Sequence, residues 1–127
     1  MKFLLDTHIL LWVSQDSKLL SKYAKSLVTN GDNDVYFSTA SIWEIMIKKN
    51  TGKFKIDVAE FMRDISDMNI FELPIKIEHV LTLETLPNHH KDPFDRILVA
   101  QSLTEPLKLL THDKILQQYS TDLIEYV

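Results

Sequence analysis

The chain has 127 residues, 45% of them hydrophobic, which is enough to bury the core of one domain without disulfides or a structural metal. It contains no cysteine, which excludes disulfides and thiolate metal sites and agrees with a reducing compartment. Its formal net charge of -4 creates no positive field over the whole molecule. This balance counts against a passive nucleic-acid binder, but not against an enzyme whose acids hold cations.

The N-terminal stretch MKFLLDTHILLWV places a lysine ahead of an apolar run, as a secretory signal does. However, Asp6 and His8 interrupt that run, and no small-residue cleavage site follows it. Its uncharged apolar block is far shorter than the ~20 residues that a membrane helix needs. We therefore expect a cytoplasmic protein that does not engage a membrane.

Apolar and β-branched runs predict the strands, and apolar residues at helical spacing predict the helices between them. In chain order, strands are expected at 2–6, 34–38, 70–74, 107–111 and 123–127. Helices are expected at 8–13, 17–30 (capped by Asp16), 41–50, 58–69, 75–87, 93–103 and 113–119. Alternating strands and helices imply an α/β fold with a mostly parallel sheet covered on both faces. No linker or repeat is visible, so residues 1–127 are expected to form a single domain.

Acidic residues recur where the predicted strands end. Asp6 ends the first strand, and Asp113 follows the fourth after an apolar run and a polar residue. Functional groups of open parallel sheets gather at the carboxyl ends of the strands, near the switch in strand order, so both acids are expected on one edge. Glu44 lies early in the helix after the second strand, and Asp92 and Asp95 open the helix at 93–103. These three acids are expected to overlook the same edge.

Converging carboxylates are costly unless something compensates their charge. Two carboxylates about 5 Å apart repel by roughly 3 kcal/mol at an effective dielectric of 20. Several such pairs approach the whole stability of a domain, which is typically about 5–15 kcal/mol. The cluster must therefore take up protons or hold a cation, and oxygen ligands favour Mg²⁺ or Mn²⁺. A divalent ion on carboxylates can activate water and neutralise a phosphodiester during displacement.

Each acid also has a purely structural interpretation. Asp6 can cap the helix that follows it. Glu44 can close a capping box with Ser41 or form an i,i+4 pair with Lys48. Asp92, before Pro93, and Asp113 can each be the N-cap of a helix. These interpretations explain each position alone. They do not explain why the acids fall on one predicted edge.

Four histidines lie near the predicted site. His89 and His90 could bind a transition metal, but no H-E-x-x-H pattern accompanies them, so surface positions in a loop are favoured. His8 and His112 follow strand ends. They either line the pocket or are solvated or partly buried.

Two tryptophans and a run of lysines remain as candidates for contact with nucleic acid. Trp12 and Trp43 lie within apolar helices, which favours positions in the core over base stacking. The basic stretch consists of Lys48, Lys49, Lys53 and Lys55. It can guide RNA, although a solvated helix end is the default interpretation.

Four segments, in order, resemble the PIN-domain family and, within it, the VapC-type toxin ribonucleases. They are LLDTHILLW, STASIWEIMIKKNTGKF, LPNHHKDPFDRILVAQ and LLTHD, and the likeness spans nearly the whole chain. The resemblance implies a PIN-like α/β/α sandwich and hydrolysis of RNA phosphodiesters with Mg²⁺ or Mn²⁺ held by acids. It also implies a small antitoxin that inserts a segment into the acidic groove, and a homodimer.

Carried over position by position, the acids that the family uses as metal ligands and catalytic residues fall on Asp6, Glu44, Asp95 and Asp113. Thr7 and Thr111 match hydroxyl positions beside the first and last acids, with substrate contact as their implied role. Arg96 is expected to contact a substrate phosphate or to form a salt bridge with a neighbouring acid. Asp92 belongs to the H-x-D-P-F-D-R variant of the motif, where we expect it to be the N-cap and Asp95, at N3, to be the ionised ligand.

The residues and the resemblance together predict a metal-dependent endoribonuclease that uses metal-activated water. A phosphatase with Asp6 as nucleophile ranks lower, because that class needs a second aspartate where His8 stands. A degenerate PIN-like domain that only binds RNA or a partner is the non-enzymatic alternative. The intact set of acids argues against it, since a pure binder has no reason to keep carboxylates that repel one another.

Overall fold

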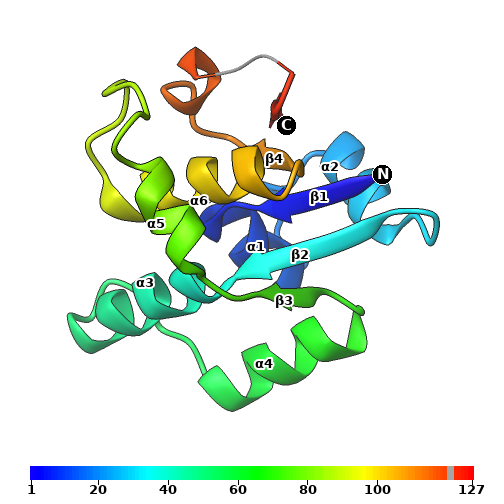
Figure 1. Ribbon diagram of the computed structural model, residues 1–127. Helices are drawn as coiled ribbons and strands as arrows, with labels where there is room; N and C mark the ends of the chain where they lie inside the picture. Colours follow the sequence, from blue (N-terminus) through cyan, green and yellow to red (C-terminus); the bar gives the residue numbers. More distant parts are fainter. Residues whose placement is uncertain (120–121) are drawn as a thin grey trace.

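Short apolar runs pair side by side into one sheet in which every strand is parallel to its neighbours. The computed structural model describes residues 1–119 and 122–127. The strands are β1 (Lys2–Leu5), β2 (Asp34–Ser38), β3 (Phe71–Leu73), β4 (Lys108–Thr111) and β5 (Ile124–Tyr126). The helices are α1 (Thr7–Ser14), α2 (Lys22–Thr29), α3 (Thr39–Asn50), α4 (Val58–Asp67), α5 (Ile77–Thr82), α6 (Pro93–Thr104) and the 3-10 turn η1 (Leu116–Gln118). The strand order is β3-β2-β1-β4-β5 (Figure 1).

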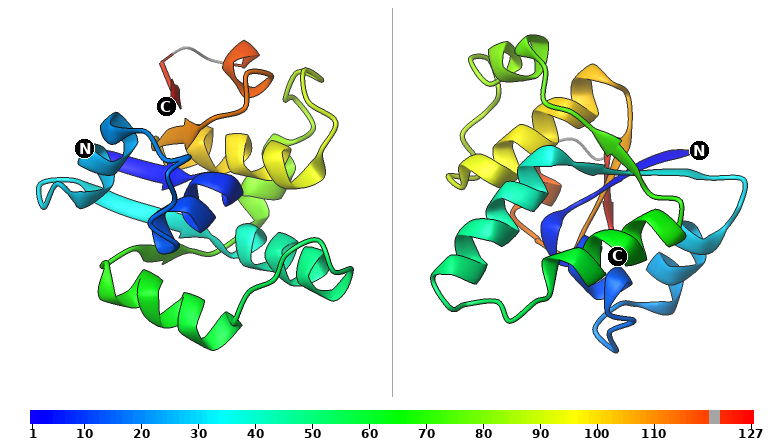
Figure 2. Two further views of the ribbon diagram at one scale, coloured as in Figure 1. Left: turned by 180° about the vertical axis from the view of Figure 1, so that it is seen from behind. Right: turned by 90° about the horizontal axis from the view of Figure 1, so that it is seen from below.

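Successive side chains of a strand point to opposite sides of the sheet, and helices cover both sides. Phe3 and Leu5 of β1 pack in one core cluster with residues of α1, α2 and α4. Leu4, between them, packs in a second cluster with residues of α6 and η1. Figures 1 and 2 show the sheet between these two helical layers. The predicted α/β fold with a parallel sheet in an α/β/α sandwich is confirmed. Within the described residues, no helix has both the length and the apolar character that crossing a membrane would require.

The topology brings the candidate acids to one edge. From β1 the chain moves outward to β2 and then β3, whereas β4 and β5 lie on the other side of β1. The strand order therefore reverses between β1 and β4, and Leu5 pairs in register with both Phe37 and Leu110 near their carboxyl ends. Such a switch point is where parallel sheets bind ligands. Asp6 and Asp113 follow the two strands that flank it.

Two predicted helices are shorter than expected. The helix predicted at 17–30 begins only at Lys22, where Ser21 is the N-cap and accepts from the amide of Ala24. Asp16 is not that cap, because it adopts a left-handed backbone conformation (φ 47°) after α1 and its carboxylate pairs with Lys25 at 3.0 Å. The prediction at 75–87 yields only α5, because the chain continues beyond it as i to i+3 turns.

The remaining differences concern one short turn and one tryptophan. The helix predicted at 113–119 is a turn followed by η1. Trp43 was predicted in the core, but 62% of it is exposed. The prediction is wrong because Ala40, Glu44 and Ile45 form the buried side of α3, which leaves the indole on the surface against the ring of Phe94. Trp12 is partly buried against the first core cluster.

Candidate metal centre

Asp6 connects β1 to α1 and is only 4% exposed. Its Oδ1 accepts from the amide of Ile9 at 2.8 Å, which makes Asp6 the N-cap of α1. Its Oδ2 accepts from the hydroxyl of Thr111 at the end of β4. Burial raises the pKa of Asp6, and the hydrogen bond from Thr111 opposes this rise. The capping interpretation of Asp6 is therefore correct, and the carboxylate also lies at the switch point.

Glu44 reaches the same edge from α3 and is 5% exposed. Its Oε1 accepts from the hydroxyl of Thr7 at 2.6 Å, and its Oε2 accepts from the ammonium of Lys48 at 2.7 Å. The i,i+4 pair with Lys48 is thus formed. The capping box with Ser41 is not, because α3 begins at Thr39 with Ser38 as its N-cap.

The two aspartates at the start of α6 occupy the predicted positions, whereas the ionised state predicted for Asp95 is opposed by its burial, which raises its pKa. Asp92 is the N-cap, and its Oδ1 accepts from the amides of Phe94 at 2.8 Å and Asp95 at 3.3 Å. Pro93 occupies the first helical position, where its missing N–H costs no hydrogen bond. Asp95 stands at the third position, still within the first turn. There the helix dipole favours a carboxylate.

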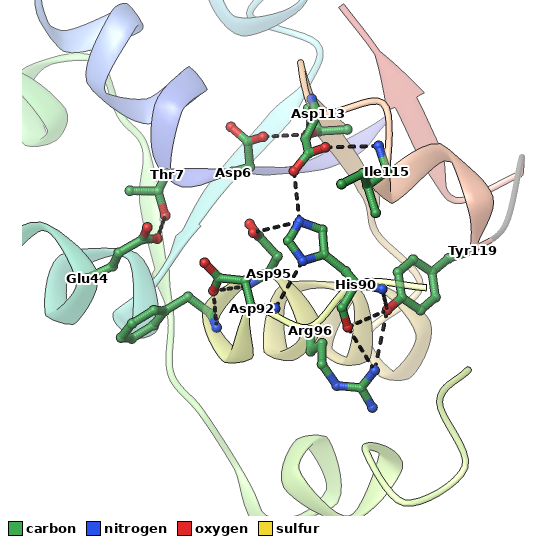
Figure 3. Close-up of polar contacts among 12 residues, drawn as sticks. Asp6, Thr7, Glu44, His90, Asp92, Asp95, Arg96, Asp113, Ile115 and Tyr119 are labelled. Carbon is green, nitrogen blue, oxygen red and sulfur yellow. Dashed lines mark hydrogen bonds and ion pairs between the residues drawn. The ribbon is translucent and has the colours of Figure 1, made fainter. Parts of the chain in front are cut away.

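Asp113 follows β4 and is tied to Asp6 through one hydroxyl. The amide of Asp113 donates to Thr111 Oγ1 at 3.0 Å, and that hydroxyl donates to Asp6. Oδ1 of Asp113 accepts from the amide of Ile115 at 2.9 Å, which closes the turn before η1. Oδ2 faces the site and accepts from a histidine of the loop before α6 (Figure 3).

That histidine is His90, which the sequence analysis assigned to the surface. The assignment is wrong, because its side chain is only 13% exposed. Its Nε2 lies 2.9 Å from Asp113 Oδ2 and 3.2 Å from Asp95 Oδ2. Its Nδ1 accepts from the amide of Asp92 at 3.0 Å. That acceptor role assigns the proton to Nε2, so the ring donates toward the two carboxylates. The neighbouring His89 is exposed, as predicted.

The carboxylates affect one another electrostatically. The pKa of Asp95 is raised from 3.8 to about 7, first by burial and then by the charge of Asp92, while His90 opposes the rise. Glu44 and Asp6 raise it further. Asp6, Glu44, Asp92 and Asp95, which come from α1, α3 and α6 or the residues that cap them, therefore interact electrostatically. Figure 3 shows Asp6, Glu44, Asp95 and Asp113 around the same space.

This donor set fits a hard divalent cation. The ligand atoms of His90, Asp95 and Asp113 all lie within 4.8 Å of one another. The surrounding acids supply oxygen atoms. Burial raises the pKa of Asp95 most, and the charges of Asp92, Glu44 and Asp6, which a cation would compensate, raise it further. Nε2 of His90 offers a proton rather than a lone pair in this arrangement. The oxygens of the acids are accordingly the available ligand atoms.

The three other predicted site residues, Thr7, Thr111 and Arg96, form hydrogen bonds within the protein. Thr7 and Thr111 are buried, and their hydroxyls donate to Glu44 and Asp6. The guanidinium of Arg96 donates to the carbonyls of Pro87 at 3.1 Å and His90 at 3.3 Å, and more weakly to those of Leu83 and Leu86. It therefore holds the loop before α6 in place. Their contact with substrate stays a prediction.

Comparison with known proteins agrees with this architecture. The family model of the PIN domain matches residues 3–121. The structure of VapBC2 from Rickettsia felis bound to a promoter DNA fragment matches with a TM-score of 0.73 at 15% identity, covering 100% of this chain and 99% of that chain. VapBC-1 from nontypeable Haemophilus influenzae gives 0.66 at 19% identity, covering 100% and 97%. A toxin–antitoxin complex from Klebsiella pneumoniae gives 0.58 at 20% identity, covering 87% and 85%.

At these identities the similarity to solved structures concerns the fold. Among curated proteins, none matches the sequence. The family match, in contrast, spans nearly the whole chain and includes the ends of β1 and β4 and the start of α6. The family predicted from the four sequence segments is confirmed. The chain belongs to the PIN-domain family.

Proposed function

We propose that this protein is a metal-dependent endoribonuclease, and that it is the toxin of a toxin–antitoxin pair. One observation carries the enzymatic part. Buried or half-buried carboxylates from β1, α3, α6 and the end of β4 gather at the switch point of a parallel sheet. Burial there, and then the charges of Asp92, Glu44 and Asp6, raise the pKa of Asp95 to about 7. A protein that only binds a partner gains nothing from this repulsion.

The proposed ligands are Asp6, Glu44, Asp95 and Asp113. A Mg²⁺ or Mn²⁺ ion bound there supplies a Lewis acid that lowers the pKa of a water molecule and neutralises the phosphodiester. The chain supplies the orientation of the carboxylates. Backbone amides fix one oxygen each of Asp6 and Asp113, and the hydroxyls of Thr7 and Thr111 fix Glu44 and Asp6 from behind.

His90 has a distinct part in this proposal. Its Nε2–H lies between the carboxylates of Asp95 and Asp113 and relieves some of their repulsion in the metal-free protein. Its Nδ1 ties the ring to the backbone of Asp92 at the helix start. His90 therefore acts as a positioning residue for the two acids that frame the site.

An apolar surface beside the acids supports the proposal of a protein partner. It is a groove between α3, α5 and the start of α6 that is lined by Trp43, Ile75, Val80 and Phe94, and its residues Trp43 and Phe94 directly precede Glu44 and Asp95. Exposed apolar patches of this kind mark protein interaction sites. Because the similar solved structures include toxin–antitoxin complexes, we propose a small antitoxin as the partner, and a second copy of this chain as the partner in a homodimer. Purification from the source cell as an active chain without a small protein bound would contradict the antitoxin.

Incubation of the purified protein with single-stranded RNA tests the enzymatic function. We expect cleavage in Mg²⁺ or Mn²⁺ that a chelator stops. Asp95→Asn should abolish cleavage, because it removes a proposed ligand at the start of α6. Glu60→Gln is the matched control, because Glu60 is an exposed acid at the third position of α4 and lies outside the site. RNA that is bound but never cleaved, under any metal, would support the degenerate binding domain instead.

A further inference from the structure

Five aromatic rings form a continuous strip on the surface beside the acids. The strip consists of His8, Trp12, Phe54, His112 and Tyr126. The ring centroids of Tyr126 and His112 are 5.0 Å apart in a stacked arrangement, and His112 lies 5.6 Å from Trp12. Trp12 lies 6.1 Å from His8, which lies 6.4 Å from Phe54. The rings come from α1, from the segment after α3 and from the ends of β4 and β5, so only the fold brings them together.

The strip is joined to the candidate metal centre at its Phe54 end, and two of its other rings belong to sequence neighbours of site residues. His8 follows Thr7, which holds Glu44, and His112 directly precedes Asp113. At the far end, the ammonium of Lys48 lies 5.4 Å from the centroid of the Phe54 ring and pairs with Glu44 at 2.7 Å. A polymer whose backbone passes the acids would therefore meet the strip with its neighbouring units.

The exposure of the rings argues against a role in the core alone. Trp12 and Phe54 are half-buried and pack against the first core cluster, so they form a fixed base. His8 and His112 lie on this base and are exposed. The ring of His112 is held in place by Tyr126 and by a contact of 2.6 Å between its Nδ1 and the carbonyl of Val127. The chain thus holds two imidazole faces in fixed positions at the surface.

We propose that the aromatic strip binds unpaired bases of single-stranded RNA next to the scissile phosphate. This inference rests on the proposed function. Aromatic faces stack on any base and so bind single strands with little base preference. Lys53 and Lys55 are exposed on either side of Phe54, and they supply positive charge for phosphates on a chain that is acidic as a whole. An acidic peptide would also be attracted by this charge, but it has no bases to stack on the rings, so the aromatic faces favour a nucleic acid.

A binding experiment in an inactive background tests the strip. The parent is Asp95→Asn, and the probe is a labelled oligoadenylate of about eight nucleotides, within the usual footprint of single-strand binding sites. We expect His8→Ala and His112→Ala each to weaken binding about fivefold or more in fluorescence anisotropy. His112→Phe should retain most of the affinity, because it keeps an aromatic face. A duplex of the same length should bind more weakly than the single strand.

Phe71→Ala is the matched control, since Phe71 is an exposed aromatic residue (52%) on the edge strand β3, which lies at the opposite side of the sheet from β4 and β5. It should leave the affinity unchanged. Absence of single-strand binding by the parent, or equal affinities of the parent and both histidine variants, would overturn the inference. Unchanged RNA affinity with lost binding of a protein partner would also overturn it and make the strip a protein surface.

Cleavage kinetics separate this inference from the proposed function. In the otherwise native protein, His112→Ala should raise KM for single-stranded RNA and change kcat little, because stacking beside the reacting phosphate contributes to substrate binding. Cleavage with an unchanged KM in the histidine variants would refute the strip alone. If the unmodified protein shows no metal-dependent cleavage of RNA, the proposed function is refuted. The binding comparison would then still test whether the aromatic strip binds single-stranded RNA.

Discussion

Replacing Asp95 with Asn should stabilise the metal-free protein at neutral pH. The unfolded chain ionises this carboxyl near pH 3.8, whereas the native protein does so near pH 7. The stability that the protonated Asp95 contributes is therefore fully present below the pKa of the unfolded chain. It is lost as the pH rises through the pKa of the native protein. Since one pKa unit corresponds to about 1.4 kcal/mol, the full loss is about 4 kcal/mol.

The sign of this effect follows from a comparison of magnitudes. Asp95 gains from its position at the start of α6, but a carboxylate in the first turn of a helix contributes only about 0.3–1 kcal/mol. Burial and the neighbouring acids outweigh that gain. The side chain is 21% exposed, so solvent screens it only in part. Asn resembles the protonated acid and should remove the loss.

Urea unfolding in a chelator, from about pH 4.5 to about pH 8, measures the difference in free energy of unfolding. Asp95→Asn should be more stable than the wild type by only about 1 kcal/mol at the acid end, and by up to about 4 kcal/mol at the alkaline end. Glu60→Gln should show no such gain. Parallel curves for the wild type and Asp95→Asn across this range would refute the argument that the acids share one field.

Three further predictions concern the neighbouring residues. Asp92→Ala should cost about 1 kcal/mol in urea unfolding, the usual value of a lost N-cap, and should keep measurable RNA cleavage; the reverse outcome for Asp92 and Asp95 would exchange their roles. Mn²⁺ should raise the melting temperature of the wild type by mass action and raise that of Asp6→Asn less, and equal shifts would remove Asp6 from the site. His90→Ala should lower the stability in a chelator by about 1–3 kcal/mol, because the amide of Asp92 loses its acceptor and two carboxylates lose a donor. Added Mn²⁺ should narrow that loss, and a variant as stable as the wild type in the chelator would show that His90 does not hold the acids.

The acids were predictable because local signals determine where they lie. A buried apolar run that ends in Asp6 or Asp113 marks the carboxyl end of a strand, and parallel pairing then brings these ends to one edge. Asp92 before Pro93 marks a helix start in the same way, which also determines the turn on which Asp95 lies. Each of these inferences needs only a few neighbouring residues and the alternation of strands with helices.

His90 was not predictable, because its position depends on contacts between distant segments. Its amide donates to the hydroxyl of Tyr119, which lies 29 residues further along the chain, at 2.9 Å. Its carbonyl accepts from Arg96, which also gathers the carbonyls of Leu83 and Leu86. The available signal was the H-x-D-P spacing, which allows a ring nitrogen to accept from the amide of Asp92.

The structural and the ligand interpretations of the acids do not exclude each other. An ionised carboxylate has about four acceptor positions, and a backbone amide fills one of them. For Asp6 and Asp113 that amide belongs to the first turn after the strand and fixes the direction of the carboxylate. Hydrogen bonds to the ionised form also oppose the rise in pKa that burial causes. Asp6 is therefore oriented, and kept nearer its ionised form, before any cation arrives, as preorganisation of a metal ligand requires.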